Sequence, residues 1–258
     1  MNTLAFIIIF LFGTIIGSFL NVVIFRLNTG KSIAKGRSIC MTCNRDLRWY
    51  ELVPLFSFLI QRGKCLRCKE SISYQYPLVE FITGISFVLI AYHFLPALLF
   101  SSSLYLFLVV LYAFLFSLLI VIGVYDVRHK VIPDQLVYLY TFISFFSIFL
   151  SPSFSHFIAG PIIALPFALI WYLSSGKWMG LGDAKLMLGL GFMLGLPLGV
   201  SSLVLAFWIG AVVGLLIMFF SRSKVNMKTE IPFAPFLIIS AFIVFLFNLD
   251  IYTLSSLF

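Results

Sequence analysis

Long runs of apolar residues, separated by shorter polar segments, make up most of this sequence. Several runs approach the roughly 20 residues that a helix needs to cross the hydrocarbon core of a bilayer. A backbone in lipid must satisfy its own hydrogen bonds, so each run predicts a helix. The pattern predicts an all-α polytopic membrane protein of about eight transmembrane helices, at 4–25, 77–95, 103–124, 135–150, 156–174, 186–199, 201–220 and 232–249.

Composition supports this class, because 62% of the residues are hydrophobic and only 10% are charged. A soluble domain carries about 25% charged residues. The first apolar run has no basic residue ahead of it and no small-residue cleavage pattern after it. It is therefore interpreted as a transmembrane helix and not as a signal peptide.

The basic residues follow the order of the predicted helices. Ten of the seventeen lie between Arg26 and Lys69, after the first helix, and the rest follow the third, fifth and seventh. Basic loops stay on the cytoplasmic side, so we expect cytoplasmic odd-numbered loops and both termini outside. The net charge of +8 is then explained by this bias and by anionic membrane lipids, with no nucleic-acid partner. The later basic residues are Arg128, Lys130, Lys177, Lys185, Arg222, Lys224 and Lys228.

Three parts are expected along the chain. Residues 1–26 form the first transmembrane helix, and 27–76 form a cytoplasmic cysteine-rich loop. Residues 77–258 form a seven-helix catalytic bundle in the membrane.

All four cysteines fall in the long loop, as two C-x2-C pairs separated by 21 residues: Cys40, Cys43, Cys65 and Cys68. This spacing is typical of a structural zinc site, and a reducing compartment argues against disulfides. Two reduced thiol turns without metal are the alternative. Apolar residues between the pairs, such as Trp49 and Phe56, predict a small lid or a segment that dips into the membrane surface.

Two aspartates, Asp126 after the third predicted helix and Asp183 before the sixth, are placed by the charge pattern at the cytoplasmic face. Two facing carboxyl groups that share a proton can activate water for peptide hydrolysis, one as base and the other as acid. Gly180 and Gly182 leave room beside Asp183 for a substrate strand. The alternative is that both aspartates are ordinary charges at helix ends.

Other ionisable residues are interpreted more simply. Asp134 suits the first turn of the fourth helix. Glu80 either pairs with a basic residue of the loop or lines a polar cavity. His93 is interpreted as interfacial, and the sequence contains no His-Glu-x-x-His and no convincing Gly-x-Ser-x-Gly motif.

Five motifs in order give the chain a resemblance to a known family. They are Gly17-Ser18-Phe19-Leu20-Asn21-Val22-Val23 with Arg26, the two cysteine pairs, Tyr76-Pro77-Leu78-Val79-Glu80, the two aspartate motifs (Asp126 with Ile132-Pro133-Asp134, and Gly180-Leu181-Gly182-Asp183-Ala184-Lys185-Leu186), and Ile231-Pro232-Phe233-Ala234-Pro235-Phe236. Together they resemble the type IV prepilin peptidases, although Ala234 stands where that family usually has glycine.

The resemblance implies a membrane aspartyl protease of the bacterial inner membrane, with Asp126 and Asp183 as its dyad. Its substrates would be prepilins or pseudopilins, which are single-helix proteins with a short basic leader that is cut at the cytoplasmic face. It also implies methylation of the new N-terminus with S-adenosylmethionine. Candidate residues for substrate or cofactor binding are Asn21, Arg26, Glu80, Gly180, Gly182 and Lys185.

Two other functions remain open from the sequence. A proton- or ion-coupled transporter, or a scaffold, would use its aspartates near the middle of the membrane and would show matching broken helices. A peptidase that does not methylate is the second alternative.

Overall fold

The structure is a computed structural model that describes residues 3–150, 154–220 and 232–250. Arg222, Lys224, Lys228 and Ile231, on which parts of the charge pattern and of the last motif depend, lie outside these ranges. Within them the chain is helical, with only isolated β-bridges in the cysteine loop. The helices are α1 (Thr3–Arg26), η1 (Trp49–Glu51), α2 (Phe56–Ile60), α3 (Gln75–His93), η2 (Leu95–Leu99), α4 (Ser102–His129), α5 (Asp134–Ser147), η3 (Ile148–Leu150), α6 (Phe154–Ser174), α7 (Leu181–Phe220) and α8 (Ala234–Phe247).

Five of the described helices, α1, α3, α4, α6 and α7, are long and apolar enough to cross a membrane. The shorter α5 and α8 have 14 residues each. At 1.5 Å per residue they are about 21 Å long, less than the roughly 30 Å hydrocarbon core. The predicted all-helical polytopic class is confirmed, while the count of eight crossings stays a prediction.

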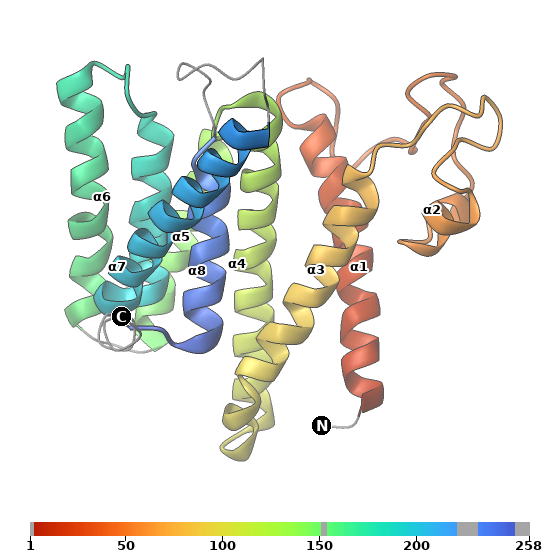
Figure 1. The fold of residues 1–258 in the computed structure, drawn as a ribbon. Helices are drawn as coiled ribbons and strands as arrows, with labels where there is room; N and C mark the ends of the chain where they lie inside the picture. Colours follow the sequence, from red (N-terminus) through yellow and green to blue (C-terminus); the bar gives the residue numbers. More distant parts are fainter. Residues whose placement is uncertain (1–2, 151–153, 221–231, 251–258) are drawn as a thin grey trace. The chain divides into compact units, whose positions relative to one another are not determined.

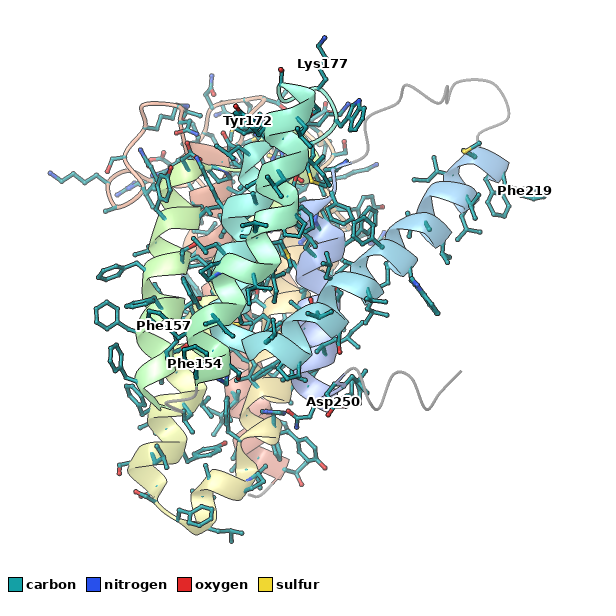
Figure 2. All side chains as sticks on the ribbon, turned by 90° about the vertical axis from the view of Figure 1, so that its left-hand side faces the viewer. Phe154, Phe157, Tyr172, Lys177, Phe219 and Asp250 are labelled. Atoms are coloured by element: carbon teal, nitrogen blue, oxygen red, sulfur yellow. The ribbon has the colours of Figure 1, made fainter. Side chains whose placement is uncertain are left out.

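The longest helix, α7, covers two of the predicted segments and is broken between them. Gly195 has φ 77° and ψ 173°, a conformation that is essentially limited to glycine. Pro197 follows two residues later and lacks the N–H that a continuous helix needs. The break therefore lies at Gly195, a few residues before the boundary predicted between the segments 186–199 and 201–220. Figure 2 shows the consequence, because Phe219 at the far end of α7 lies well away from Tyr172 and Lys177 near the end of α6.

The chain divides into two compact units, Met1–Val121 and Ile122–Phe258. This boundary lies inside α4, and the expected division at residues 26 and 76 stays a prediction.

The first unit is built on α1 and α3, which pack closely because glycines face the contact. A Cβ atom on Gly13 would lie 2.8 Å from the Cα atom of Gly84, and one on Gly17 would lie 2.7 Å from the Cα atom of Glu80. Gly13 and Gly17 are four residues apart, the spacing that lets membrane helices approach each other closely. The close contact places Glu80 beside the end of α1 that leads into the cysteine loop.

We expect Gly17→Ala to destabilise the protein by about 1–3 kcal/mol, because a new methyl group would meet the backbone of α3 rather than a flexible side chain. Thermal unfolding in detergent measures this change. Gly214→Ala is the matched control, because a Cβ atom at Gly214 has no neighbour within 4 Å. Equal melting temperatures for the two variants would contradict the packing described.

The second unit is arranged around α7, which packs against α5, α6 and α8. The first half of α7 is rich in glycine, and Gly191 approaches Gly160 of α6 so closely that a Cβ atom would lie 2.7 Å from its Cα atom. Figure 1 shows the C-terminal end of α4 and the N-terminal ends of α5, α7 and α8 at the same end of this unit. Several polar residues of the second unit gather at that end.

Candidate active site and metal centre

The two aspartates singled out in the sequence both belong to the second unit and interact electrostatically with each other. Asp126 lies in the last turn of α4, which continues to His129 instead of stopping at residue 124 as predicted. Asp183 lies in the first turn of α7. Asp126 is 5% exposed and Asp183 is half-buried. The carboxyl group of Asp126 is therefore shielded from solvent, while Asp183 stays partly accessible.

The start of α8 contributes a third group to this pair. The backbone N–H of Ala234, the first residue of α8, donates a hydrogen bond to the carboxyl group of Asp126. The first N–H groups of a helix have no partner within the helix, and they favour a negative charge. The residue that replaces the family's usual glycine thus acts through its backbone, so its methyl group leaves this bond unchanged. Sequence reasoning gave the motif no role, although a proline at the start of a helix is a recognisable signal.

The two glycines before Asp183 have different surroundings. A Cβ atom on Gly180 would lie 3.8 Å from Oδ2 of Asp183, which is ordinary contact distance. One on Gly182 would lie 2.8 Å from the Cβ atom of Ile132. Gly182 therefore lets α7 start tightly against the segment before α5, and the expected role of both glycines in substrate access stays a prediction.

An ion pair joins the starts of α5 and α7 beside the aspartates. Nζ of Lys185 lies 2.7 Å from Oδ1 of Asp134 and 4.9 Å from the ring centre of Tyr138. Asp134 is the first residue of α5, as its predicted role at a helix start requires. Because Lys185 is two residues after Asp183, this pair fixes where the first turn of α7 lies relative to α5.

We expect Lys185→Met and Asp134→Asn each to lower the activity of the aspartate pair by up to about tenfold, through a small displacement of Asp183. The Asp134 side chain is 59% exposed, so the effect on stability should stay below about 1 kcal/mol. The double variant should be no slower than the slower single variant, because both substitutions remove the same contact. Losses that multiply in the double variant would show that the residues act separately.

In the first unit, the two cysteine pairs form turns of the same design. The N–H of Cys40 donates to the carbonyl of Arg45, and the N–H of Cys65 donates to that of Glu70. Asn44 and Lys69, each four residues after the first cysteine of its turn, both have positive φ. The two turns thus present their thiols in equivalent ways.

The four sulfur atoms lie within 4.8 Å of one another, and those of Cys40 and Cys68 are 3.8 Å apart. A zinc ion binds cysteine sulfur at about 2.3 Å, which makes the edge of a tetrahedral site about 3.8 Å. The cluster therefore fits a closed four-thiolate metal site.

Hydrogen bonds around the cluster set the charge of its thiols. The pKa of Cys65 is lowered to about 6 by the backbone N–H groups of Cys68 and Arg67, with further help from Arg45. The N–H of Cys43 likewise lowers the pKa of Cys40. For Cys68 the N–H of Glu70 favours the thiolate, but burial and the bonds that it shares with the other cysteines outweigh this and raise its pKa to about 11.

An ion pair supports the cluster from the side. Nη1 of Arg45 donates to Oε2 of Glu51 over 3.0 Å, and its other terminal nitrogen lies 3.9 Å from the sulfur of Cys65. The hydrogen bond from Arg45 lowers the pKa of Glu51, so this buried carboxylate stays charged. A second acidic residue of the loop, Asp46, also pairs with a basic neighbour, Arg37.

Asn21, Arg26 and Glu80 line one cavity of about 680 Å³ in the first unit, between α1, the start of α3 and the cysteine loop. Asn21 donates to the carbonyls of Gly17 and Tyr76. Arg26 donates to three carbonyls of residues 32–37 and so shapes the wall of the cavity. Glu80 accepts hydrogen bonds from the N–H of Leu55 and from Ser18.

Comparison with known proteins matches both halves of the chain. The bacterial peptidase A24 N-terminal domain matches residues 11–94, and the type IV leader peptidase family matches residues 113–215, which include both aspartates. A prepilin leader peptidase/N-methyltransferase from Bacillus subtilis is 30% identical over 93% of this chain and 94% of that protein. Proteins of the same name from Stutzerimonas stutzeri (31%; 96% and 92%) and Vibrio cholerae (31%; 90% and 92%) are similar. No solved structure matches.

Fold and site together define a polytopic membrane protein with two carboxyl groups at one end of its helices and a four-cysteine cluster in a polar loop. The chain belongs to the type IV leader peptidase family. The resemblance drawn from the five motifs is thereby confirmed, and the family and the apolar helices indicate a bacterial inner-membrane protein.

Proposed function

We propose that this chain is a membrane aspartyl endopeptidase that removes the leader peptide of prepilins or pseudopilins and uses Asp126 and Asp183 as its catalytic pair. The observation that carries the proposal is the convergence of the two carboxyl groups, from the end of α4 and the start of α7, at one end of the second unit. The relatives named above are prepilin leader peptidases/N-methyltransferases, which supports the substrate class.

The chemistry follows from two carboxyl groups with one proton between them. The ionised carboxylate takes a proton from a water molecule, which attacks the carbonyl carbon of the peptide bond. The protonated partner donates its proton to the carbonyl oxygen, which gives a gem-diol. The first carboxyl group then passes the proton that it took from water to the leaving amine, while the partner takes a proton back from a gem-diol hydroxyl, so the pair returns to its starting state. The N–H of Ala234 holds the carboxyl group of Asp126 in place during both steps.

The proposed topology puts the active site and the cysteine loop on the cytoplasmic side, with both termini outside. The restriction of basic residues to odd-numbered loops supports this arrangement. The single transmembrane helix of the substrate would then lie in the bilayer beside the enzyme, and its basic leader would remain at the cytoplasmic surface. A transporter or scaffold is less well supported, because both aspartates lie at helix ends and not mid-membrane.

For the second activity, we place S-adenosylmethionine in the cavity lined by Asn21, Arg26 and Glu80. Its volume of about 680 Å³ falls within the range of small-molecule sites. The stacked rings of Phe25 and Tyr76 line it and offer an apolar wall for an aromatic base. The buried Glu80 carboxylate has acceptor capacity beyond its two present bonds. When bound, this cofactor supplies an electrophilic methyl group for the new N-terminal amine.

The cysteine cluster is proposed to hold a structural zinc ion. All four ligand positions would be filled by thiolates, so no position stays open for catalysis. Cys40 and Cys65 line the cavity, and zinc would therefore fix one of its walls.

The test of the proposed function uses the purified full-length protein and a prepilin, with and without S-adenosylmethionine. We expect loss of the leader in both reactions and a further gain of one methyl group, about 14 Da, only with the cofactor. An uncut prepilin would contradict the peptidase assignment. A cut but unmethylated product would restrict the function to proteolysis.

A further inference from the structure

Part of the cysteine loop exposes an unusual amount of apolar surface. We call residues 49–60, which contain η1 and α2, the arm. Trp49 is 79% exposed, Leu59 70% and Ile60 81%, and Phe56 is exposed as well. Contiguous apolar surface of this kind marks an interaction site, because water would be an unfavourable neighbour for it.

The arm is fastened to the side of α3. Leu55 has φ 60° and ψ −51°, and the N–H of Phe56 bonds to the carbonyl of Pro54, which together define a strained γ-turn. This turn aims the N–H of Leu55 at Oε2 of Glu80, over 2.8 Å. Glu80 is five residues after Gln75, so the contact lies about 7.5 Å along the helix from its start. The ring of Phe58 also lies against that of Tyr74, with centres 5.6 Å apart.

The surface of α3 next to this contact is apolar and exposed. Leu78, Phe81, Ile82 and Ile85 recur at helical spacing on one stripe of α3, which is one of the candidate membrane spans. Leu55 from the arm and Leu78 and Phe81 from the stripe line one shallow groove. The arm and the stripe therefore form one continuous apolar surface. Both parts of this surface face the same environment, either water or lipid.

The distribution of charged residues in and around the arm favours a lipid surface as its environment. The only charged residue of the arm, Glu51, is buried and paired with Arg45. The arm is bracketed by Arg48 on one side and Arg62 and Lys64 on the other, with Arg67 and Lys69 close behind. Apolar segments flanked by basic residues, with Trp and Tyr at the edge, are typical of the boundary between headgroups and acyl chains.

We propose that the arm is embedded in this lipid boundary and that phospholipid covers its apolar face. The arm would then hold the cysteine loop against the bilayer and tie its depth to Glu80 through the bond from Leu55. This proposal needs only that α3 spans the membrane. It stands or falls independently of the peptidase and methyltransferase assignments.

The first measurement uses the wild-type protein. The wild-type protein is placed in lipid nanodiscs that contain a phospholipid with a diazirine in its acyl chain, irradiated, and digested with trypsin. Cleavage after Arg48 and Arg62 releases the arm as one peptide, residues 49–62. We expect lipid adducts on this peptide and none above background on residues 38–45, a peptide that carries the exposed Met41 and serves as the control.

Three outcomes would overturn the proposal. An unlabelled 49–62 peptide, in a sample where the peptide containing α3 is labelled, would mean that protein covers the arm. Labelling that disappears with saturating prepilin would identify the arm as a substrate surface. Equal labelling of the control peptide 38–45 would mean that the arm contacts lipid no more than the rest of the cysteine loop does. A Leu59→Asp/Ile60→Asp variant should reduce the adducts severalfold, whereas Met41→Asp should leave them unchanged.

Discussion

Asp126→Asn and Asp183→Asn should each lower prepilin cleavage by at least about 1000-fold. An amide keeps the shape of the side chain but can neither take a proton from water nor give one to the leaving amine, and general acid–base catalysis contributes about 10²–10⁴. Asp126 is buried and Asp183 is half-buried, so no neighbouring water can replace either group easily. The rate is measured with purified variants and a full-length prepilin, with the cut product followed by mass spectrometry.

The matched control is Asp46→Asn. Asp46 is an exposed carboxylate that forms a surface ion pair with Arg37 in the cysteine loop. Its loss should leave the rate within about twofold of the wild type, since exposed pairs contribute about 0–1 kcal/mol. A wild-type rate for either dyad variant would remove that residue from the catalytic pair.

The second large effect is expected from Cys40→Ser/Cys65→Ser. The two substitutions together remove one thiolate from each turn, so bound zinc should fall from about one ion per chain to background, as measured by elemental analysis. Both residues line the cavity of the first unit, and methylation should fall to background with the metal. The aspartates belong to the second unit, so cleavage should fall by no more than about tenfold.

Leu66→Ala is the control for this variant, because Leu66 lies inside the second cysteine turn but is 43% exposed. It should keep both zinc and methylation. Unchanged zinc content in the double serine variant would exclude the cluster as the metal site. Full methylation by a variant that has lost its zinc would show that the metal is not needed to form the cavity.

Much of the site could be predicted because few residues compete for its roles. Nine acidic residues occur in the chain, and Asp126 and Asp183 lie at predicted helix ends within the motifs that carry the family resemblance. Asp183 is also preceded by Gly180 and Gly182. The spacing of the cysteines likewise predicted a cluster, and the structure brings the four sulfur atoms together. Patterns of residue type carry this information directly.

Other features depend on backbone geometry, which residue types indicate only weakly. The break in α7 lies at Gly195 and not at the predicted boundary between 199 and 201, because the positive φ of Gly195 decides where the chain turns. The bond from Ala234 to Asp126 involves a main-chain N–H that every residue except proline possesses. The strained turn at Leu55 could not be predicted, because a leucine and not a glycine adopts its positive φ.

The central claim, that Asp126 and Asp183 act as one unit, is tested most directly by comparing the double variant Asp126→Asn/Asp183→Asn with the two single variants. Single-turnover cleavage with excess enzyme allows the residual rates to be measured. Groups that work together lose their contribution when either is removed, so the double variant should be no slower than the slower single variant. Losses that multiply would contradict a shared catalytic pair.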